Sequence, residues 1–262
     1  MFYERPIALN RERHKSLKLS VAPDHFKFAA TTNALPIMST EFAETARHFP
    51  IVFVGEEDGP FNVAALVGLR DDENLMVDAE GQWAKGSYVP AFARRYPFVL
   101  AKSDNSQRFT VCVDEVYSGL GTQAGEALFD EQGAETPYLR RVLDFLRAFQ
   151  AEATLTSEFA DRLKELGLLV PKVIRLEHKS QPMQTLHGLW IVDAAKLRAI
   201  DNARVVELFR NGYLTWIEAH LISLGSLSRL VDRIDRQIAV TDEKGHVEPS
   251  AYSNDTGRVA PP

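Results

Sequence analysis

Two adjacent arginines, Arg94 and Arg95, lie among aromatic side chains in the stretch GSYVPAFARRYPF, residues 86–98. If the two prolines of this stretch begin and end a short helix, Tyr88 and Tyr96 lie near one helix face and the arginines point away from it. In the interpretation that we favour, the aromatic face packs on a sheet and the arginines are solvated. In the alternative, the arginine pair holds a carboxylate or phosphate beside aromatic walls.

A second set of side chains could transfer protons. Asp114 and Glu115 end an apolar run, where a carboxylate pair could act in acid–base chemistry or bind a metal. Neighbouring strand residues point to opposite faces, which favours surface or capping roles for both. His220 lies midway along the last apolar helix pattern, one turn after Trp216, and we favour a core or interface role for it. The candidate ligand-binding residues are Tyr88, Arg94, Arg95, Tyr96, Asp114, Glu115 and His220.

Other catalytic patterns are missing from the sequence. There is no G-x-x-x-x-G-K-[ST], G-x-S-x-G or HExxH, and no long amphipathic helix follows the glycine-rich YSGLGTQAG, as a dinucleotide-binding turn requires. We interpret that stretch as a loop. The one cysteine, Cys112, is expected to be buried in a strand and inert, and it excludes an internal disulfide. We predict no catalytic residue, no metal and no cofactor.

Composition limits the class of protein. The 262 residues are 45% hydrophobic and 25% charged, as in an ordinary globular protein. The formal net charge of -6 counts against a nucleic-acid binder that relies on a general positive field. No apolar run approaches the ~20 residues of a membrane-spanning helix, and the N-terminal stretch lacks the apolar core of a secretory signal. We therefore expect a soluble cytoplasmic protein without a transmembrane segment or a nucleic-acid partner.

The first half of the chain is expected to build a sheet. The opening thirty residues have no regular pattern, and the first clear helix pattern is STEFAETARHFP at 39–50. Two apolar runs within 51–69 predict a hairpin of buried strands, and NLMVDAEGQW at 74–83 predicts another hairpin. RFTVCVDEV at 108–116 completes the predicted antiparallel sheet.

The second half of the chain is expected to be mainly helical. Pro137 begins one helix pattern, a second begins near Ser157, and a hairpin follows at 172–192. A short helix at 193–200 comes next, and Asp201 is expected to cap another that ends at Gly212. The last pattern, 213–238, predicts a long C-terminal helix whose wide apolar stripe favours packing on its own chain, with a homodimer as the second option.

Together these patterns predict an α+β fold. An antiparallel sheet from the N-terminal half packs with helices from the C-terminal half, in a single domain over residues 1–240. A subdivision near 118–136 remains open, because that stretch is rich in glycine and glutamate. Residues 241–262 are polar and are expected to form a disordered tail.

Several stretches, taken in order, resemble the SapC family of bacterial proteins. The resemblance extends over roughly residues 5–238, and at position 226 this chain has Ser where we expect Asn in many relatives. The matching stretches are NRERH at 10–14, FPIVFV at 49–54, YVPAFARRYPF at 88–98, CVDE at 112–115, LFDEQG at 128–133 and AHLISLGSL at 219–227.

The resemblance implies context for a function, but no mechanism. The family is named after a gene linked to bacterial surface-layer production, and relatives are often encoded near flavin-dependent tryptophan-halogenase-like proteins and outer-membrane receptors. No catalytic residues are established for the family. The peptide-uptake permease of the same name is a membrane protein, and the present chain lacks spanning helices.

Three functional hypotheses follow from the sequence and the resemblance. The first is a non-enzymatic accessory or binding protein with a protein partner, supporting a surface-layer, uptake or halogenase-associated system. The second is an enzyme acting on an anionic small molecule or peptide, with Arg94 and Arg95 orienting the substrate and Asp114, Glu115 or His220 transferring protons. The third is a structural homodimer through residues 213–238. Association with the cell surface rests on the family name alone.

Overall fold

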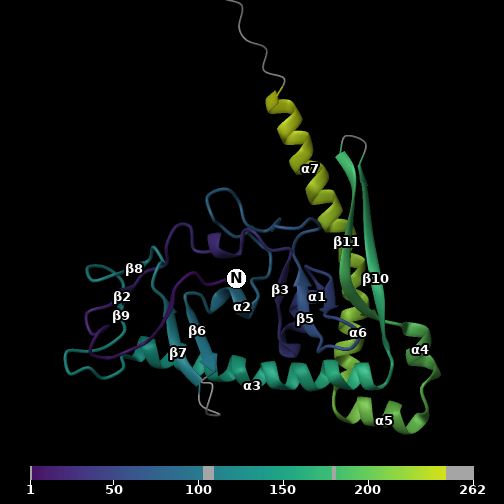
Figure 1. Ribbon diagram of the computed structural model, residues 1–262, viewed down its shortest axis with the longest axis horizontal. Coiled ribbons are helices and arrows are strands. Elements are labelled where there is room, and N and C mark those ends of the chain that lie inside the picture. The colour runs from purple at the N-terminus through teal and green to yellow at the C-terminus, as the bar shows by residue number, and fades with distance from the viewer. Residues whose placement is uncertain (1, 103–108, 179–180, 246–262) are drawn as a thin grey trace, which may run out of the picture.

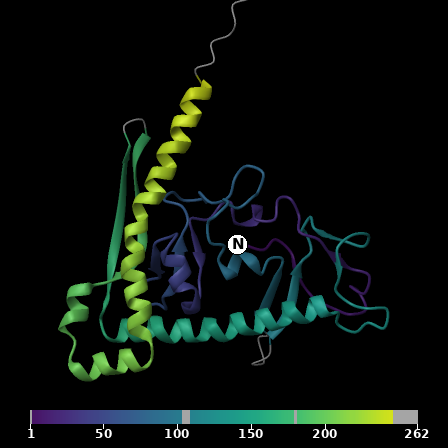
Figure 2. The same cartoon turned by 180° about the vertical axis from the view of Figure 1, so that it is seen from behind.

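The computed structural model describes residues 2–102, 109–178 and 181–245. The protein has an α+β fold, as expected, with antiparallel sheets, several helices and a long helix at the C-terminal end (Figure 1). Seen from behind, one long helix runs along the base of the molecule beneath both ends of the fold (Figure 2).

The central sheet has five antiparallel strands in the order β10-β11-β4-β5-β3. They are β3 (Ala34–Pro36), β4 (Ile51–Val54), β5 (Asn62–Leu66), β10 (Leu169–His178) and β11 (Gln181–Val192). Both hairpins expected at 51–69 and 172–192 are present, and they join where Trp190 pairs with Phe53. The side chains of β4 and β5 are almost all buried, which agrees with their continuous apolar sequences.

Two smaller sheets lie toward the other end of the molecule. One has the order β1-β7-β6, and the other has the order β8-β2-β9 with strands of only two residues. The strand expected at 108–116 is present as β7. The bounds are β1 (Pro6–Ala8), β2 (Lys18–Leu19), β6 (Phe98–Lys102), β7 (Phe109–Asp114), β8 (Leu120–Gly121) and β9 (Glu126–Ala127).

The two-residue strands correct two expectations. The opening residues are less irregular than expected, and the glycine-rich stretch that we interpreted as a loop contributes β8. Close backbone approach is the reason. A Cβ atom on Gly119 would lie 2.1 Å from the Ser20 carbonyl oxygen. One on Gly125, whose φ is +105°, would lie 2.3 Å from the Leu19 carbonyl oxygen. Glycine lets this stretch pair with β2.

The chain reverses direction within 74–83, as the expected hairpin requires, but without the two strands that were expected. Among the described residues this stretch has a single bridge between Val77 and Trp83 and no named strand. The Asn74 side chain makes two hydrogen bonds to the backbone in this region. The Asn74 amide donates to the Ala29 carbonyl at 2.9 Å and its oxygen accepts from the Met76 N–H at 2.9 Å. The Asn74 side chain thereby bonds to the backbone of Ala29 and to the backbone two residues further along its own stretch.

The helix α3 (Pro137–Glu165) is continuous, whereas the sequence predicted two helices. The predicted break fell between Thr154 and Ser157, where residues of low helix propensity cluster. The hydroxyls of Thr154 and Thr156 instead donate to the carbonyls of Gln150 and Glu152 one turn earlier. Thr156 also accepts a hydrogen bond from the buried Ser39 N–H at 2.9 Å, so tertiary contact supports the helix at this point.

Thr136 caps α3, and its loss provides a test of local stability. Its hydroxyl accepts from the Leu139 N–H at 3.2 Å and donates to the Ala127 carbonyl at 2.7 Å. We expect Thr136→Ala to lower the free energy of unfolding by about 1 kcal/mol. Urea unfolding followed by circular dichroism measures the loss. Thr136→Ser keeps the hydroxyl and should lose far less; equal losses for the two variants would contradict the capping role.

Two clusters of buried apolar side chains form the core. The larger surrounds the central sheet, and the smaller surrounds the sheet β1-β7-β6. α3 contributes to both, with Leu139 and Leu146 in the smaller cluster and Phe159 and Leu163 in the larger one. A shared helix of this kind favours one cooperative unit, and the single domain over 1–240 stays a prediction.

The remaining helices are short except for the last. Their bounds are α1 (Phe42–Ala46), α2 (Ala91–Arg94), α4 (Ala194–Ala199), α5 (Asn202–Arg210), α6 (Tyr213–Ser223) and α7 (Leu227–Gly245), with 3-10 turns at Lys27–Ala29, Ser39–Glu41 and Leu224–Ser226. Asp201 caps α5 as expected, accepting from the Arg204 N–H at 3.0 Å.

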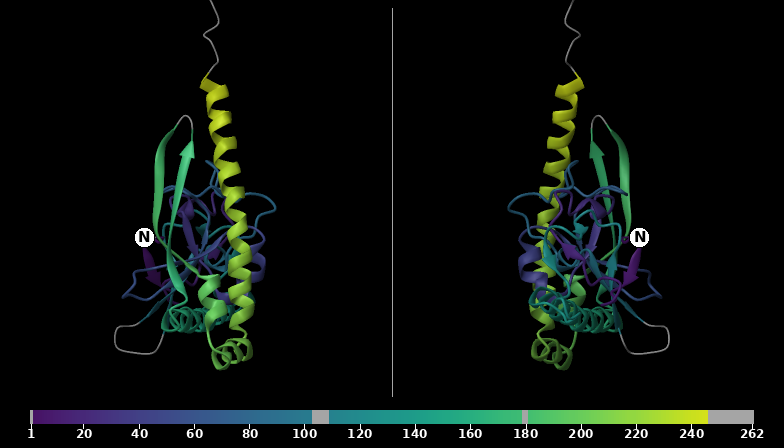
Figure 3. Two further views of the ribbon diagram at one scale, coloured as in Figure 1. Left: turned by 90° about the vertical axis from the view of Figure 1, so that its right-hand side faces the viewer. Right: turned by 90° about the vertical axis from the view of Figure 1, so that its left-hand side faces the viewer.

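The long C-terminal helix expected at 213–238 is interrupted. A 3-10 turn at Leu224–Ser226 separates α6 from α7, and the Ser223 hydroxyl there donates to the His220 carbonyl at 2.6 Å. α7 continues to Gly245, five residues into the predicted tail, and the rest of that tail lies outside the described residues. α7 and the hairpin β10–β11 project from the body in the same direction (Figure 3).

Candidate functional site

The arginine pair lies on aromatic rings at α2. The Arg95 guanidinium is centred 4.4 Å from the Phe92 ring and 4.5 Å from the Phe149 ring, and its Nε donates to the Tyr3 hydroxyl at 3.0 Å. Arg94 is exposed, and its Nε donates to the Val89 carbonyl at 3.1 Å. The aromatic face packs inward, as in the favoured interpretation, but Arg95 is half-buried instead of solvated. Its cation–π contacts hold it in place.

No carboxylate among the described residues forms an ion pair with Arg94 or Arg95. Tyr88 lies beside them, and its hydroxyl donates to the buried carboxylate of Glu41 at 2.7 Å. Burial, followed by this bond to Glu41, raises the pKa of Tyr88 above its ordinary value. Tyr88 is therefore tied to the fold, and an anion-binding role for the arginines stays a prediction.

Asp114 fastens the N-terminal segment to the end of β7. Its carboxylate is buried and accepts hydrogen bonds from the Glu4 N–H at 3.1 Å, the Arg5 N–H at 2.9 Å and the Tyr96 hydroxyl at 3.4 Å. Burial, and then the neighbouring Asp114, raises the pKa of Tyr96. Both side chains also line a small pocket, so a ligand-binding role for them stays a prediction.

The Glu115 side chain points away from that of Asp114, as the alternation of strand residues predicts. Its carboxylate forms ion pairs with Arg5 at 2.9 Å and Arg13 at 3.1 Å, at the surface. Cys112, three residues earlier in the chain and within β7, is buried, and burial raises the pKa of its thiol. The expectation of an inert strand cysteine agrees with this environment.

His220 is completely buried and both of its ring nitrogens have backbone partners. Nδ1 lies 2.9 Å from the Ile51 carbonyl oxygen, and Nε2 accepts from the Val192 N–H at 3.0 Å. Because Nε2 must accept, the ring is neutral with its proton on Nδ1. Burial lowers the pKa of His220 to about 4. The imidazole therefore links β4, β11 and α6 and has no free nitrogen for chemistry.

The seven candidate residues do not form one catalytic set. Tyr88 contacts Arg94, and Tyr96 contacts Asp114, but none of the other six forms a hydrogen bond, ion pair or ring contact with His220. Within the part of the chain that the structure describes, no group of three or more His, Cys, Asp or Glu side chains could hold a metal ion. The absence of a cofactor stays a prediction.

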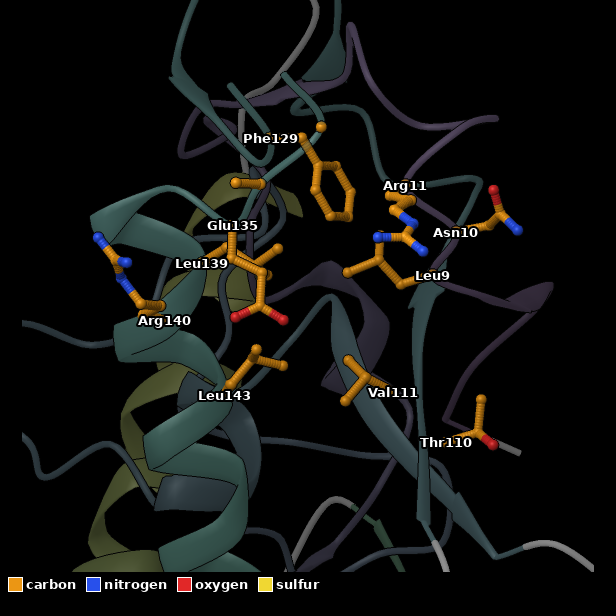
Figure 4. Close-up of a pocket in the computed structure, with 12 residues that line it drawn as sticks. Leu9, Asn10, Arg11, Thr110, Val111, Phe129, Glu135, Leu139, Arg140 and Leu143 are labelled. Carbon is orange, nitrogen blue, oxygen red and sulfur yellow. The ribbon is translucent and has the colours of Figure 1, made fainter. Parts of the chain in front are cut away.

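A large hollow among the described residues lies elsewhere, between α3 and β7. One pocket of about 730 Å³ is enclosed by α3, β7 and residues 9–11, and a second of about 660 Å³ continues along α3. Val111 and Leu143 line both, so the two pockets form one depression, which we call the α3 groove. Figure 4 shows its first part, with Arg11 and Glu135 facing the hollow from opposite sides.

The α3 groove combines an apolar floor with a basic rim. Leu139, Leu143 and Val111 form much of the floor, and Phe109 at its far part is 42% exposed. Glu135 is the one carboxylate among the lining residues that the structure describes. The lining arginines are Arg11, Arg140 and Arg147.

Two of these arginines have no ion pair within the described ranges. Arg147 pairs with Asp144 at 2.8 Å, whereas Arg11 and Arg140 have no such partner. The groove therefore has an excess of positive charge around an apolar surface. Such a site suits a ligand with both carboxylates and apolar side chains.

The residues of the α3 groove were missed at the level of sequence. The helix pattern that begins at Pro137 was predicted, but its arginines were not considered as binding residues. The sequence does contain a pattern that indicates this part of the groove: Arg140 and Arg147 are seven residues apart and flank Leu143 on one helix face. Arg11 and Val111 come from distant parts of the chain, and no local pattern places them opposite α3.

Fold and site define an α+β protein with an open, arginine-rimmed groove. The chain belongs to the SapC family, whose family model matches residues 9–230. No curated protein and no solved structure matches the chain. None of the helices within the described ranges has the length and apolar content of a bilayer crossing.

Proposed function

We propose that this SapC-family protein is a non-enzymatic binding protein whose α3 groove holds an extended, acidic segment of a protein partner. The observation that carries the proposal is the excess of arginine around an open apolar depression. The groove is large enough for such a segment. Its lining on α3 runs from Leu139 to Thr154, about 22 Å along the helix axis, which matches about seven residues of extended chain.

The chemistry of the rim suits carboxylates. Arginine binds carboxylates through paired N–H groups, and three arginines spaced along a groove suit charges spaced along a chain. The exposed Phe109 and the nearby Leu100 give apolar side chains of the same ligand a surface to cover. An extended segment that alternates acidic and apolar residues meets both requirements.

The other hypotheses have weaker support. The enzyme hypothesis needs its proton-transferring residues to converge, and His220 is enclosed by backbone partners. For the homodimer, Ile217, His220 and Ser223 of α6 are buried within the chain itself. We keep the cytoplasm as the proposed location. Participation in a surface-layer, uptake or halogenase-associated system is proposed from the family resemblance, with the partner segment coming from such a system.

Binding of an acidic peptide tests the proposal. The probe is a fluorescein-labelled peptide of about eight residues that alternates Glu with Leu, and the matched control peptide replaces each Glu by Lys. Fluorescence anisotropy should show saturable binding of the acidic peptide and at least tenfold (about 1.4 kcal/mol) weaker binding of the basic one. Equal binding of the two peptides, or no saturable binding, would contradict the proposal.

Charge reversal on α3 locates the site. Arg140→Glu combined with Arg147→Glu should weaken binding of the acidic peptide about tenfold or more, because attraction becomes repulsion. Arg198→Glu combined with Arg210→Glu, on the exposed surfaces of α4 and α5, makes the same change of net charge; this control variant should change the affinity less than about twofold. If the control variant weakens binding as strongly as the double variant, only the overall charge of the protein matters and the groove is not the site.

A further inference from the structure

A second hollow lies where the N-terminal segment, the turn at residues 24–31 and the end of β7 meet. It has a volume of about 370 Å³ and does not share a lining residue with the α3 groove. We call it the aromatic pocket, because five of its lining residues carry rings. These are Phe2, His25, Phe28, Tyr96 and Tyr117.

Four of the five rings of the aromatic pocket contact one another, and the fifth, Phe2, packs on Phe92. Phe28 stacks on Tyr96 with ring centroids 4.0 Å apart, and Tyr117 meets Tyr96 edge-on at 5.2 Å. The Tyr117 hydroxyl accepts from the Ala22 N–H at 2.9 Å and lies 2.7 Å from His25 Nδ1. The walls are therefore arranged before any ligand enters, which lowers the entropic cost of binding.

Charge in the aromatic pocket is mainly negative. The carboxylates of Glu4, Asp24 and Asp114 line it, against one amine from Lys27. Asp24 is fixed by the Ser118 hydroxyl, which donates to it at 2.7 Å. Burial lowers the pKa of His25, so its ring is neutral at pH 7 and adds no opposing charge.

We propose that the aromatic pocket is a binding site for a small organic cation, a primary or quaternary ammonium group. Ring faces carry negative potential and attract cations, and the carboxylates add a net negative charge at the same place. The volume lies at the lower end of small-molecule sites, which suits a compact ligand. A metal ion fits less well, because aromatic carbon offers no ligand atoms.

The site is independent of the α3 groove and of the partner proposed for it. The groove is basic and elongated, whereas the aromatic pocket is acidic and compact. Failure of one proposal leaves the other untouched, and the charge reversal at Arg140 and Arg147 should not alter binding in the aromatic pocket.

Choline and its neutral tert-butyl analogue, in which carbon replaces nitrogen, test for cation recognition. The two probes have the same shape, so a difference in affinity reports the charge. Isothermal titration calorimetry on the full chain should show saturable choline binding, at least tenfold (about 1.4 kcal/mol) tighter than binding of the analogue. Equal affinities, or no saturable binding of choline, would overturn the proposal.

Three variants assign the binding to this pocket. Glu4→Gln combined with Asp24→Asn removes two charges with little change of shape and should weaken choline binding about tenfold, while Lys27→Gln should strengthen it about twofold. Glu56→Gln, at an exposed carboxylate between β4 and β5, is the matched control and should leave the affinity unchanged. If Glu56→Gln weakens choline binding as much as the double variant, the cation binds to the general surface charge and the proposal fails.

Discussion

Replacing His220 with alanine is expected to lower the free energy of unfolding by about 3–5 kcal/mol. The imidazole is completely buried and contacts the Phe53 ring edge-on at 5.2 Å, so truncation leaves a cavity. It also leaves the Ile51 carbonyl and the Val192 N–H without a partner inside the protein. Chemical denaturation measured at neutral pH gives the loss directly. A loss below about 1 kcal/mol would contradict the structural role.

The same residue predicts a dependence of stability on pH. The pKa of His220 is about 4 in the folded protein and near 6.5 in the unfolded chain. Between these values the unfolded chain binds more protons, so stability is complete above about pH 6.5 and falls as the pH decreases toward 4. His220 alone should account for a loss of about 3 kcal/mol over this range.

A non-titrating variant separates His220 from the other groups that titrate in the same range. Burial also lowers the pKa of His14 and of His25, so the wild-type protein is expected to lose stability in acid for more than one reason. His220→Gln can keep a hydrogen bond but cannot take up a proton. Its free energy of unfolding should depend less steeply on pH between about 6.5 and 4 than that of the wild type. Parallel curves would show that His220 does not titrate as described.

Sequence patterns predicted the elements whose cause is local. The hairpin at 51–69 follows from two β-branched apolar runs around a polar turn, and Asp201 caps α5 through a bond three residues away. The continuity of α3 was missed because its support is not local. Thr156 lowers helix propensity in the sequence, yet in the fold it bonds to Ser39, more than a hundred residues distant.

In the candidate site, too, local clusters could be predicted from the sequence, whereas contacts between distant segments could not. The arginine pair was recognisable as a local cluster, but the ring of Phe149 that holds Arg95 comes from α3, and no spacing indicates it. The α3 groove unites Arg11, Val111 and Arg140, which no motif connects. His25 belongs to none of the sequence motifs considered above, and only the fold places it beside Tyr117. Pockets formed by distant segments require the three-dimensional structure.

Glu41 makes more contacts in the fold than its position in the sequence pattern indicates. It lies near the start of the helix pattern predicted at 39–50, where acidic residues are favourable. In the fold the residue is only 6% exposed, and its carboxylate accepts three hydrogen bonds. The donors are the Met38 N–H at 2.8 Å, the Ala91 N–H at 2.7 Å and the Tyr88 hydroxyl at 2.7 Å. Glu41 therefore caps its own turn and the start of α2, and orients Tyr88 beside Arg94.

Glu41→Ala is accordingly expected to lower the free energy of unfolding by about 3–5 kcal/mol, since it leaves two buried N–H groups unpaired and removes the acceptor of the Tyr88 hydroxyl. Tyr88→Phe removes only one of the three bonds and should lose about 1–2 kcal/mol. Urea denaturation compares the two variants under identical conditions. Because Glu41 helps to raise the pKa of Tyr88, the alanine variant should also shift that phenol toward its ordinary pKa in a spectrophotometric titration. If Glu41→Ala loses no more stability than Tyr88→Phe, the carboxylate does not hold the turn and α2 together.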